Sequence, residues 1–385
     1  MLRVLASPRA AGVIGCLTLL LIGWSGLLVP SLIRSIEHDF GQTDAGIGIY
    51  YLVWAVSYAC GSLGGGMVTE RLGRRRVLVG AALTHGVGLT VLAFVPPWGI
   101  ALLSAIPGGL GAGALDGGAN GLILDLFQTA RGRALNTLHL FFSIGALSSP
   151  LVVGQLVGAG IDWEGILVVT AVAVVPVAGL YAVAAMPDGR HAALPREAGT
   201  RAKTPIAFTW PLLTLELGIA CYVAAEVGVS DWLVRFLDSV PLGTATGALS
   251  LFWAGLALGR LVSARIADRF DHLQFTIVAA TVAGVATFAA VVVPWVGASI
   301  ALFGLVGFAS GPVFPMIVAI AGDRFPERSA AVGGFVTGAA VFGSVLYPPV
   351  MGFMSVNVGL AAAMIGAGVL SLACTGSLLA ARRSQ

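Results

Sequence analysis

Gly66-Met67-Val68-Thr69-Glu70-Arg71-Leu72-Gly73-Arg74-Arg75-Arg76 is a short, strongly basic stretch between two long apolar runs, 45–68 and 77–96. About 20 mostly apolar residues form a helix long enough to cross the roughly 30 Å hydrocarbon core of a membrane. Both runs meet that requirement, whereas the arginines between them would be costly in lipid. The stretch is therefore predicted to be a tight loop that joins two membrane-spanning helices.

The same length criterion, applied outward from this loop, predicts an all-α membrane protein. Twelve spanning helices are expected, with cores at 11–33, 45–68, 77–96, 99–124, 134–158, 163–186, 207–230, 244–266, 273–294, 297–321, 330–354 and 357–380. Only 10% of the 385 residues are charged and mean hydropathy is +0.95, whereas soluble proteins carry about 25% charged residues. The composition excludes a soluble globule, and the 53 glycines, many inside apolar runs, predict close helix packing.

Basic residues predict the orientation, because lysine and arginine collect on the cytoplasmic side of a membrane. The N-terminus, the loops after the even-numbered helices and the C-terminal tail carry most of them, whereas the other loops are mostly acidic. We therefore expect both termini to be cytoplasmic. The run 11–33 is too long for a signal peptide, so we expect a multi-pass protein of a cell membrane, namely a bacterial inner or plasma membrane.

The two halves of the chain resemble each other at a constant offset of 198 residues. This shift places Glu70 on Asp268, Gly145 on Gly343 and Pro150 on Pro348. Many transporters consist of two such repeats around a central path. We expect two pseudo-symmetric six-helix bundles, 1–187 and 206–385, joined by a cytoplasmic linker over 188–205.

The basic loop resembles the signature loop of the major facilitator superfamily, in which a glycine, an acid, a second glycine and several basic residues link these two helices. The resemblance implies a gating latch built from Gly66, Glu70, Arg71, Gly73 and Arg74. We expect Gly66 to allow close helix contact, Glu70 to accept hydrogen bonds from an arginine or a helix N-terminus, and Gly73 to make the turn. The alternative is a plain positive-inside anchor.

The second half carries a degenerate copy of this loop, Ala264-Arg265-Ile266-Ala267-Asp268-Arg269-Phe270-Asp271-His272. Alanine and aspartate stand where the resemblance implies glycines. Asp268 and Arg269 are the gating candidates on this side.

Four charged residues lie deep inside the predicted spans, away from the span ends, where each requires a partner or a function. They are Asp116, Glu216, Glu226 and Arg260. Asp116, Glu216 and Arg260 are at comparable depths and are expected to meet across a cavity, with Glu226 nearer the outer side. The alternatives are a fixed Asp116–Arg260 ion pair and an interfacial Glu226.

Four helices resemble the sugar–proton symporters of the fucose, galactose and glucose permease type. The matching stretches are 109–120, 133–146, 222–233 and 311–315. The resemblance makes Asp116 the protonatable acid and places Asn120, His139 and Glu226 on cavity-lining positions, with Tyr222 in the same stretch as Glu226. His139 could instead be a packing residue. Since the first span contains no acid, Asp116 or Glu226 would have to carry the proton alone.

We predict a transporter that moves a small solute, a sugar or a similar polar metabolite, by alternating access, with protons as a possible second partner and the lipid bilayer as its surroundings. A drug–proton exporter, a lipid translocase and a non-transporting sensor or scaffold are the alternatives. No nucleophile–base pair, metal-spaced cluster or phosphate-binding glycine loop occurs in the sequence. We therefore expect that the protein is not an enzyme and uses no metal or cofactor. We also expect a monomer with no nucleic-acid partner.

Overall fold

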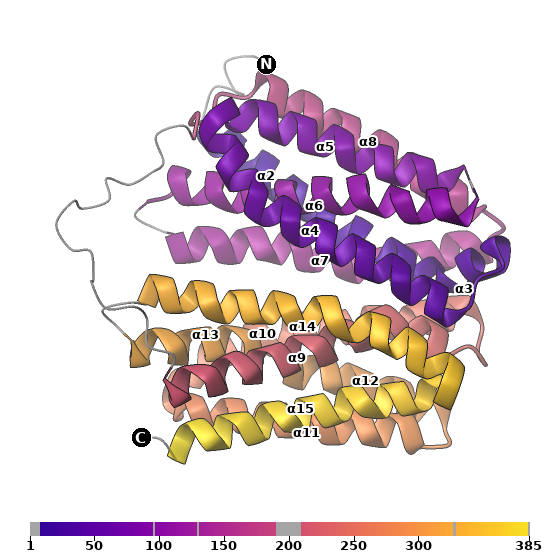
Figure 1. Ribbon diagram of the computed structural model, residues 1–385, viewed down its shortest axis with the longest axis vertical. Helices are drawn as coiled ribbons and strands as arrows, with labels where there is room; N and C mark the ends of the chain where they lie inside the picture. Colours follow the sequence, from indigo (N-terminus) through magenta and orange to yellow (C-terminus); the bar gives the residue numbers. More distant parts are fainter. Residues whose placement is uncertain (1–7, 95–96, 129–130, 190–208, 326–328, 384–385) are drawn as a thin grey trace. The chain divides into compact units, whose positions relative to one another are not determined.

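The computed structural model describes residues 8–94, 97–128, 131–189, 209–325 and 329–383, and every regular element in these ranges is a helix (Figure 1). Most of the expected linker lies outside them. The helices are α2 (Pro8–Gly26), α3 (Leu28–Phe40), α4 (Asp44–Leu72), α5 (Arg74–Ala93), α6 (Trp98–Leu126), α7 (Arg131–Gly158), α8 (Trp163–Val183), α9 (Trp210–Phe236), α10 (Leu242–Ile266), the 3-10 helix η1 (Ala267–Arg269), α11 (His272–Val292), α12 (Val296–Ser310), α13 (Val313–Arg324), α14 (Ser329–Val358) and α15 (Leu360–Arg383).

Twelve of the described segments are long and apolar enough to span a membrane, as predicted. Two spans differ from the expected single helices. The first, Ala10–Phe40, is broken at Leu27, and the tenth, Val296–Arg324, is broken at Gly311 and Pro312. Both breaks have a proline as their cause, since Pro30 and Pro312 lack an N–H and their rings clash with the carbonyl four residues earlier.

The chain divides into two compact units, residues 1–41 with 49–203, and residues 42–48 with 204–385. In the first unit α5 packs on α6 and α8, and α2 packs on α7. In the second unit α9 packs on α14 and α15, α10 on α12, and α11 on α15. Each unit is therefore a helix bundle with its own buried core.

Residues 42–48, which include the start of α4, are part of the second unit. Asp44 is buried there and accepts a hydrogen bond from Arg235 Nε at 2.8 Å. The hydroxyl of Ser355 donates to the same carboxylate. This buried ion pair attaches the first turn of α4 to α9 and α14.

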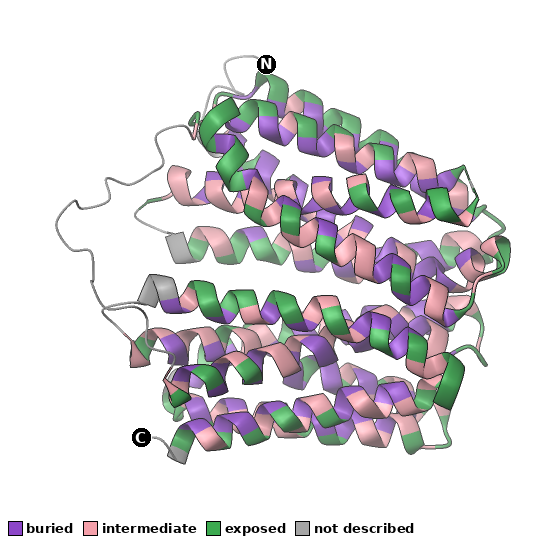
Figure 2. Cartoon of the chain, viewed as in Figure 1, coloured by how far each residue is buried: buried purple, intermediate pink, exposed green. Residues whose placement is uncertain are grey.

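Glycines bring the helices of each unit into close contact, as their position in apolar runs predicts. A Cβ added at Gly113 of α6 would lie 2.0 Å from the Tyr58 carbonyl oxygen of α4, and one added at Gly307 of α12 would lie 2.0 Å from the Phe252 carbonyl oxygen of α10. Figure 2 shows buried and exposed stripes along the helices. The exposed stripes carry large apolar side chains such as Leu63, as expected where lipid is the solvent.

Candidate functional site

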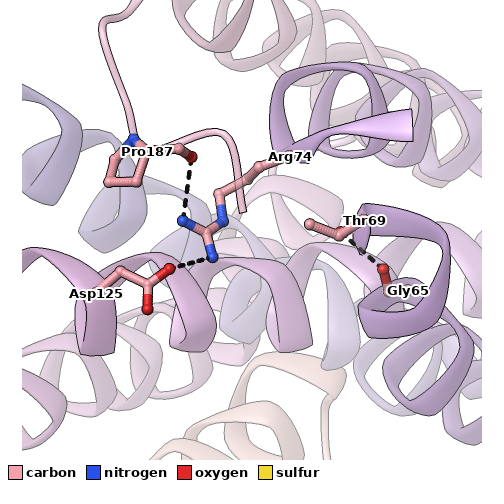
Figure 3. A network of polar contacts seen from close by, with 5 residues as sticks. All are labelled: Gly65, Thr69, Arg74, Asp125 and Pro187. Carbon is pink, nitrogen blue, oxygen red and sulfur yellow. Dashed lines mark hydrogen bonds and ion pairs between the residues drawn. The ribbon is translucent and has the colours of Figure 1, made fainter. Parts of the chain in front are cut away.

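The loop between α4 and α5 centres on a buried arginine (Figure 3). Gly73 precedes the first residue of α5 and has φ +84°, ψ 147°, a conformation that is essentially restricted to glycine. Arg74 follows it, with its side chain 5% exposed. The guanidinium Nη2 lies 2.6 Å from Asp125 Oδ2 of α6, and Nη1 donates to the Pro187 carbonyl at 3.2 Å. The expected turn at Gly73 is present.

Two details of the predicted latch are wrong in this structure. A Cβ added at Gly66 would meet nothing within 4 Å; close contact occurs five residues earlier, where a Cβ added at Gly61 would lie 2.2 Å from the Leu110 carbonyl oxygen. Glu70 is exposed, so the acid that neutralises the buried arginine is Asp125. Helix periodicity places Gly66 on the open face of α4, and only the packing of α6 brings Asp125 to the loop.

The backbone after α8 is bound to the same loop. Arg75 Nη2 donates to the Ala184 carbonyl at 2.9 Å, and Arg74 N donates to the Asp188 carbonyl at 2.8 Å. Gly189, at φ +75°, lies against Thr69 and Arg74. The beginning of the segment toward the second unit is thus held by the arginines of the loop, whereas Arg71 is exposed.

The second copy of the loop has a different local structure. Asp271, at the position that corresponds to Gly73, precedes α11 with φ −61° and accepts a hydrogen bond from Gln274 N at 2.7 Å. A side-chain cap replaces the glycine turn. Arg269 is exposed at the end of η1, and the Asp268 side chain lies outside the described part of the chain. The gating role of this copy stays a prediction.

A polar cluster in the first unit surrounds Asp116 of α6. Tyr58 of α4 donates to Asp116 Oδ2 at 2.7 Å, and Asn120 Nδ2 donates to Asp116 Oδ1 at 3.0 Å. His139 of α7 is exposed and interacts electrostatically with the carboxylate. The predicted trio of Asp116, Asn120 and His139 is therefore brought together, and both carboxylate oxygens accept a hydrogen bond.

Tyr58 is the residue of this cluster that the sequence analysis missed. Its ring stacks on Trp54, with centroids 5.1 Å apart. Gly109 and Gly113 lie against the carbonyls of Trp54 and Tyr58, so small residues on α6 let α4 approach and deliver the hydroxyl. The available signal was the series of glycines four residues apart on α6.

A second polar cluster, in the second unit, joins α9 to the break between α12 and α13. The Tyr222 hydroxyl contacts Glu226 and lies 2.9 Å from the Ser310 carbonyl oxygen. Arg260 of α10 interacts electrostatically with Glu226, and its Nε lies 3.4 Å from the Gly311 carbonyl oxygen. The helix break leaves carbonyls without their usual donors, and these side chains supply them.

Glu216 is not part of either cluster. Its Oε1 is buried and has no hydrogen-bond partner in the described residues, and it lines a groove between α9 and α14. Glu216 was expected to meet Asp116 and Arg260 across a cavity; within the second unit Arg260 interacts with Glu226, ten residues further along α9. Whether Asp116 meets residues of the second unit stays a prediction.

The described residues contain no group of three or more potential metal ligands.

Comparison with known proteins gives consistent matches. The profile of the Major Facilitator Superfamily matches residues 13–304 and 242–384. The chain is 24% identical to the gentisate transporter of Corynebacterium glutamicum, covering 90% of this chain and 81% of that protein. It is also 24% identical to the glucose/galactose transporter of Brucella abortus, covering 89% and 88%. The fold matches that of a bacterial homologue of the human lysosomal transporter Spinster, inward-facing and unoccupied, with a TM-score of 0.80, 16% identity and 97% coverage of both chains.

Proposed function

Because this chain belongs to the major facilitator superfamily and is therefore a membrane transporter of small solutes, we propose that it carries a polar solute by alternating access of its two units. A sugar is the first candidate. The observation that carries the proposal is the Asp116 cluster, in which a carboxylate, a phenol and an amide are held together inside a membrane span. Its relatives are transporters and not enzymes.

The chemistry of the Asp116 cluster suits a hydroxylated solute. Asp116 accepts from Tyr58 and Asn120, and solute hydroxyls can donate to the remaining lone pairs of the carboxylate, to the Tyr58 hydroxyl oxygen or to the amide oxygen of Asn120. Buried polar groups of this kind discriminate strongly against ligands that leave them unpaired. The likeness to a glucose/galactose transporter over most of the chain is in keeping with a sugar.

The Glu226 cluster suits a coupled proton. The hydroxyl of Tyr222 has a single proton but contacts both Glu226 and the Ser310 carbonyl. Both contacts are satisfied together when Glu226 is protonated and donates to Tyr222, which then donates to Ser310. An ionised Glu226 would instead compete with the carbonyl for that proton. We propose that Glu226 takes up and releases the coupled proton and that Asp116 binds the solute.

A carboxylate solute is the second candidate. The gentisate transporter of C. glutamicum matches 90% of the chain, and Arg260 places a guanidinium inside a membrane span. A guanidinium binds carboxylates through paired hydrogen bonds. In this alternative Arg260 exchanges its interaction with Glu226 for the carboxylate of the solute. A drug–proton exporter and a lipid translocase would transport neither class.

Uptake into proteoliposomes tests these proposals. The uptake of labelled glucose, galactose or gentisate is measured with and without an inward proton gradient. The proteins compared are wild type, Asp116→Asn, Glu226→Gln and the control Asp162→Asn. Asp162 is an exposed acid whose side chain makes no capping hydrogen bond. We expect Asp116→Asn to raise the KM strongly. We expect Glu226→Gln to lose gradient-driven accumulation but to keep solute exchange at equal concentrations.

Two outcomes would contradict the assignments. Gradient-driven accumulation at the wild-type rate in Glu226→Gln would exclude Glu226 as the proton carrier. An unchanged KM in Asp116→Asn would exclude Asp116 from the solute site. Uptake of gentisate but of neither sugar, abolished by Arg260→Gln, would favour the carboxylate alternative.

A further inference from the structure

A groove opens between α9 and α14 on one side of their closest contact. At that contact a Cβ added at Gly343 would lie 2.1 Å from the Ala220 carbonyl oxygen. Toward the N-terminal ends of both helices lies a cavity of about 480 Å³. It is lined by Leu213, Glu216, Leu217 and Ala220 of α9 and by Gly334, Phe335, Gly338, Ala339 and Phe342 of α14.

Glycines leave the α14 side of the groove open. A Cβ added at Gly334 or Gly338 would meet nothing within 4 Å. Leu217 and Phe342 are strongly exposed at its edge. The cavity lies within the 300–1,000 Å³ range that is typical of small-molecule sites.

Glu216 is the one charged residue among the described residues that line this groove. The other lining side chains are aliphatic, aromatic or absent. Glu216 Oε1 is shielded from solvent and has no hydrogen-bond partner among the described residues. A buried polar oxygen without a donor is costly, and an ionisable group inside a membrane span calls for a named partner.

We infer that the groove between α9 and α14 binds a hydrophobic organic cation, with the positive group against Glu216 and the apolar body against the leucines and phenylalanines. The carboxylate repels anions. A sugar would find one polar side chain for several hydroxyls, so most of them would lose water without compensation. A hydrophobic cation neutralises Glu216, buries apolar surface and gains from the aromatic faces of Phe335 and Phe342.

Within the second unit this groove is separate from the proton site proposed above. Glu216 precedes Glu226 by ten residues on α9, which corresponds to about 15 Å along the helix axis at 1.5 Å per residue. The inference therefore does not depend on which solute is transported. Equilibrium binding tests it without any uptake measurement.

The experiment measures binding of tritiated tetraphenylphosphonium to the full chain in phosphatidylcholine nanodiscs, with empty nanodiscs subtracted. Tetraphenylborate, an anion of the same shape, is the ligand control. Glu216→Gln removes the charge, and Gly338→Leu fills the groove. Gly376→Leu is the matched control, because Gly376 is an exposed glycine of α15 whose added Cβ also meets nothing within 4 Å. Thermal unfolding shows that each variant is folded.

We expect saturable binding of the cation to wild type and to Gly376→Leu. Glu216→Gln and Gly338→Leu should each weaken it by about tenfold or more, which corresponds to about 1.4 kcal/mol. Tetraphenylborate should not bind saturably. The inference is overturned if wild type does not bind the cation, if a folded Glu216→Gln or Gly338→Leu binds it as wild type does, or if the anion binds equally well. The two variants lie on different helices, so misfolding of one leaves the other as a test.

Discussion

Replacement of Asp125 tests whether this acid is what allows Arg74 to be buried. Asp125→Ala removes the carboxylate from its contact at 2.6 Å with Arg74 Nη2. The guanidinium, 5% exposed, then retains the Pro187 carbonyl at 3.2 Å. A positive charge is left desolvated without an acid, so the first unit should be less stable.

The magnitude follows from the burial of the two partners. Removing one member of a buried ion pair costs about 3–5 kcal/mol. The Asp125 side chain is 31% exposed, so water can enter and the loss should be near the lower limit, about 3 kcal/mol. The double replacement Arg74→Met with Asp125→Ala also removes the charge. Because apolar replacement of a buried ion pair is often neutral or stabilising, the double variant should recover about 1–2 kcal/mol.

Thermal unfolding of the purified chain in nanodiscs measures both effects. About 3 kcal/mol corresponds to a Tm lower by roughly 6–12 °C, at 2–4 °C per kcal/mol for a unit of 150–250 residues. The double variant should melt above Asp125→Ala. Two results would refute the argument that the acid neutralises a desolvated charge. One is a Tm of Asp125→Ala equal to that of wild type, and the other is a double variant that melts below Asp125→Ala.

Three further predictions use the same unfolding measurement. Gly73→Ala should lower the free energy of unfolding by about 1–3 kcal/mol, because alanine is strained at positive φ. Gly66→Ala, with open space around the residue, should be neutral or stabilise the protein by up to about 1 kcal/mol. Equal losses of stability in the two variants would contradict this difference. Gly113→Ala should cost about 1–3 kcal/mol, since its Cβ would meet a carbonyl of α4 at 2.0 Å, and an unchanged Tm would mean that α6 can shift freely. Asp44→Ala removes the acceptor of Arg235 and Ser355, but Arg235 is 30% exposed and keeps Asp238 at 3.1 Å, so the loss should be about 1.5–3 kcal/mol, and the argument fails if the Tm is unchanged.

The spans were predictable from hydropathy, whereas two irregularities inside them were not located in advance. The twelve apolar runs match twelve described segments, because length and composition alone decide whether a helix can cross a membrane. The first span continues to Phe40 and is interrupted at Leu27. Pro30 in the sequence indicates that the helix can break in this region. The exact position of the break depends on which backbone carbonyls the neighbouring residues can supply with hydrogen-bond donors.

The site was predicted in part. Charged residues inside apolar runs identified Asp116, Glu226 and Arg260, and their i, i+4 neighbours Asn120 and Tyr222 follow from helix periodicity. Tyr58 and Asp125, each on a helix other than that of its partner, were missed. No local pattern links Tyr58 to Asp116 or Asp125 to Arg74, since these pairs are 58 and 51 residues apart.

The basic loop at residues 66–76 shows which features follow from the local sequence and which depend on tertiary packing. The sequence alone determined that this loop joins two spanning helices, that Gly73 would make the turn and that the arginines would avoid lipid, because helix length, backbone sterics and the cost of charge in hydrocarbon act locally. The partner of the buried arginine was decided by tertiary structure. Packing of α6 brings Asp125 to Arg74, and the end of α8 brings the Pro187 carbonyl. Hydrogen bonds and ion pairs depend on distance in space, which the glycine contacts between helices set.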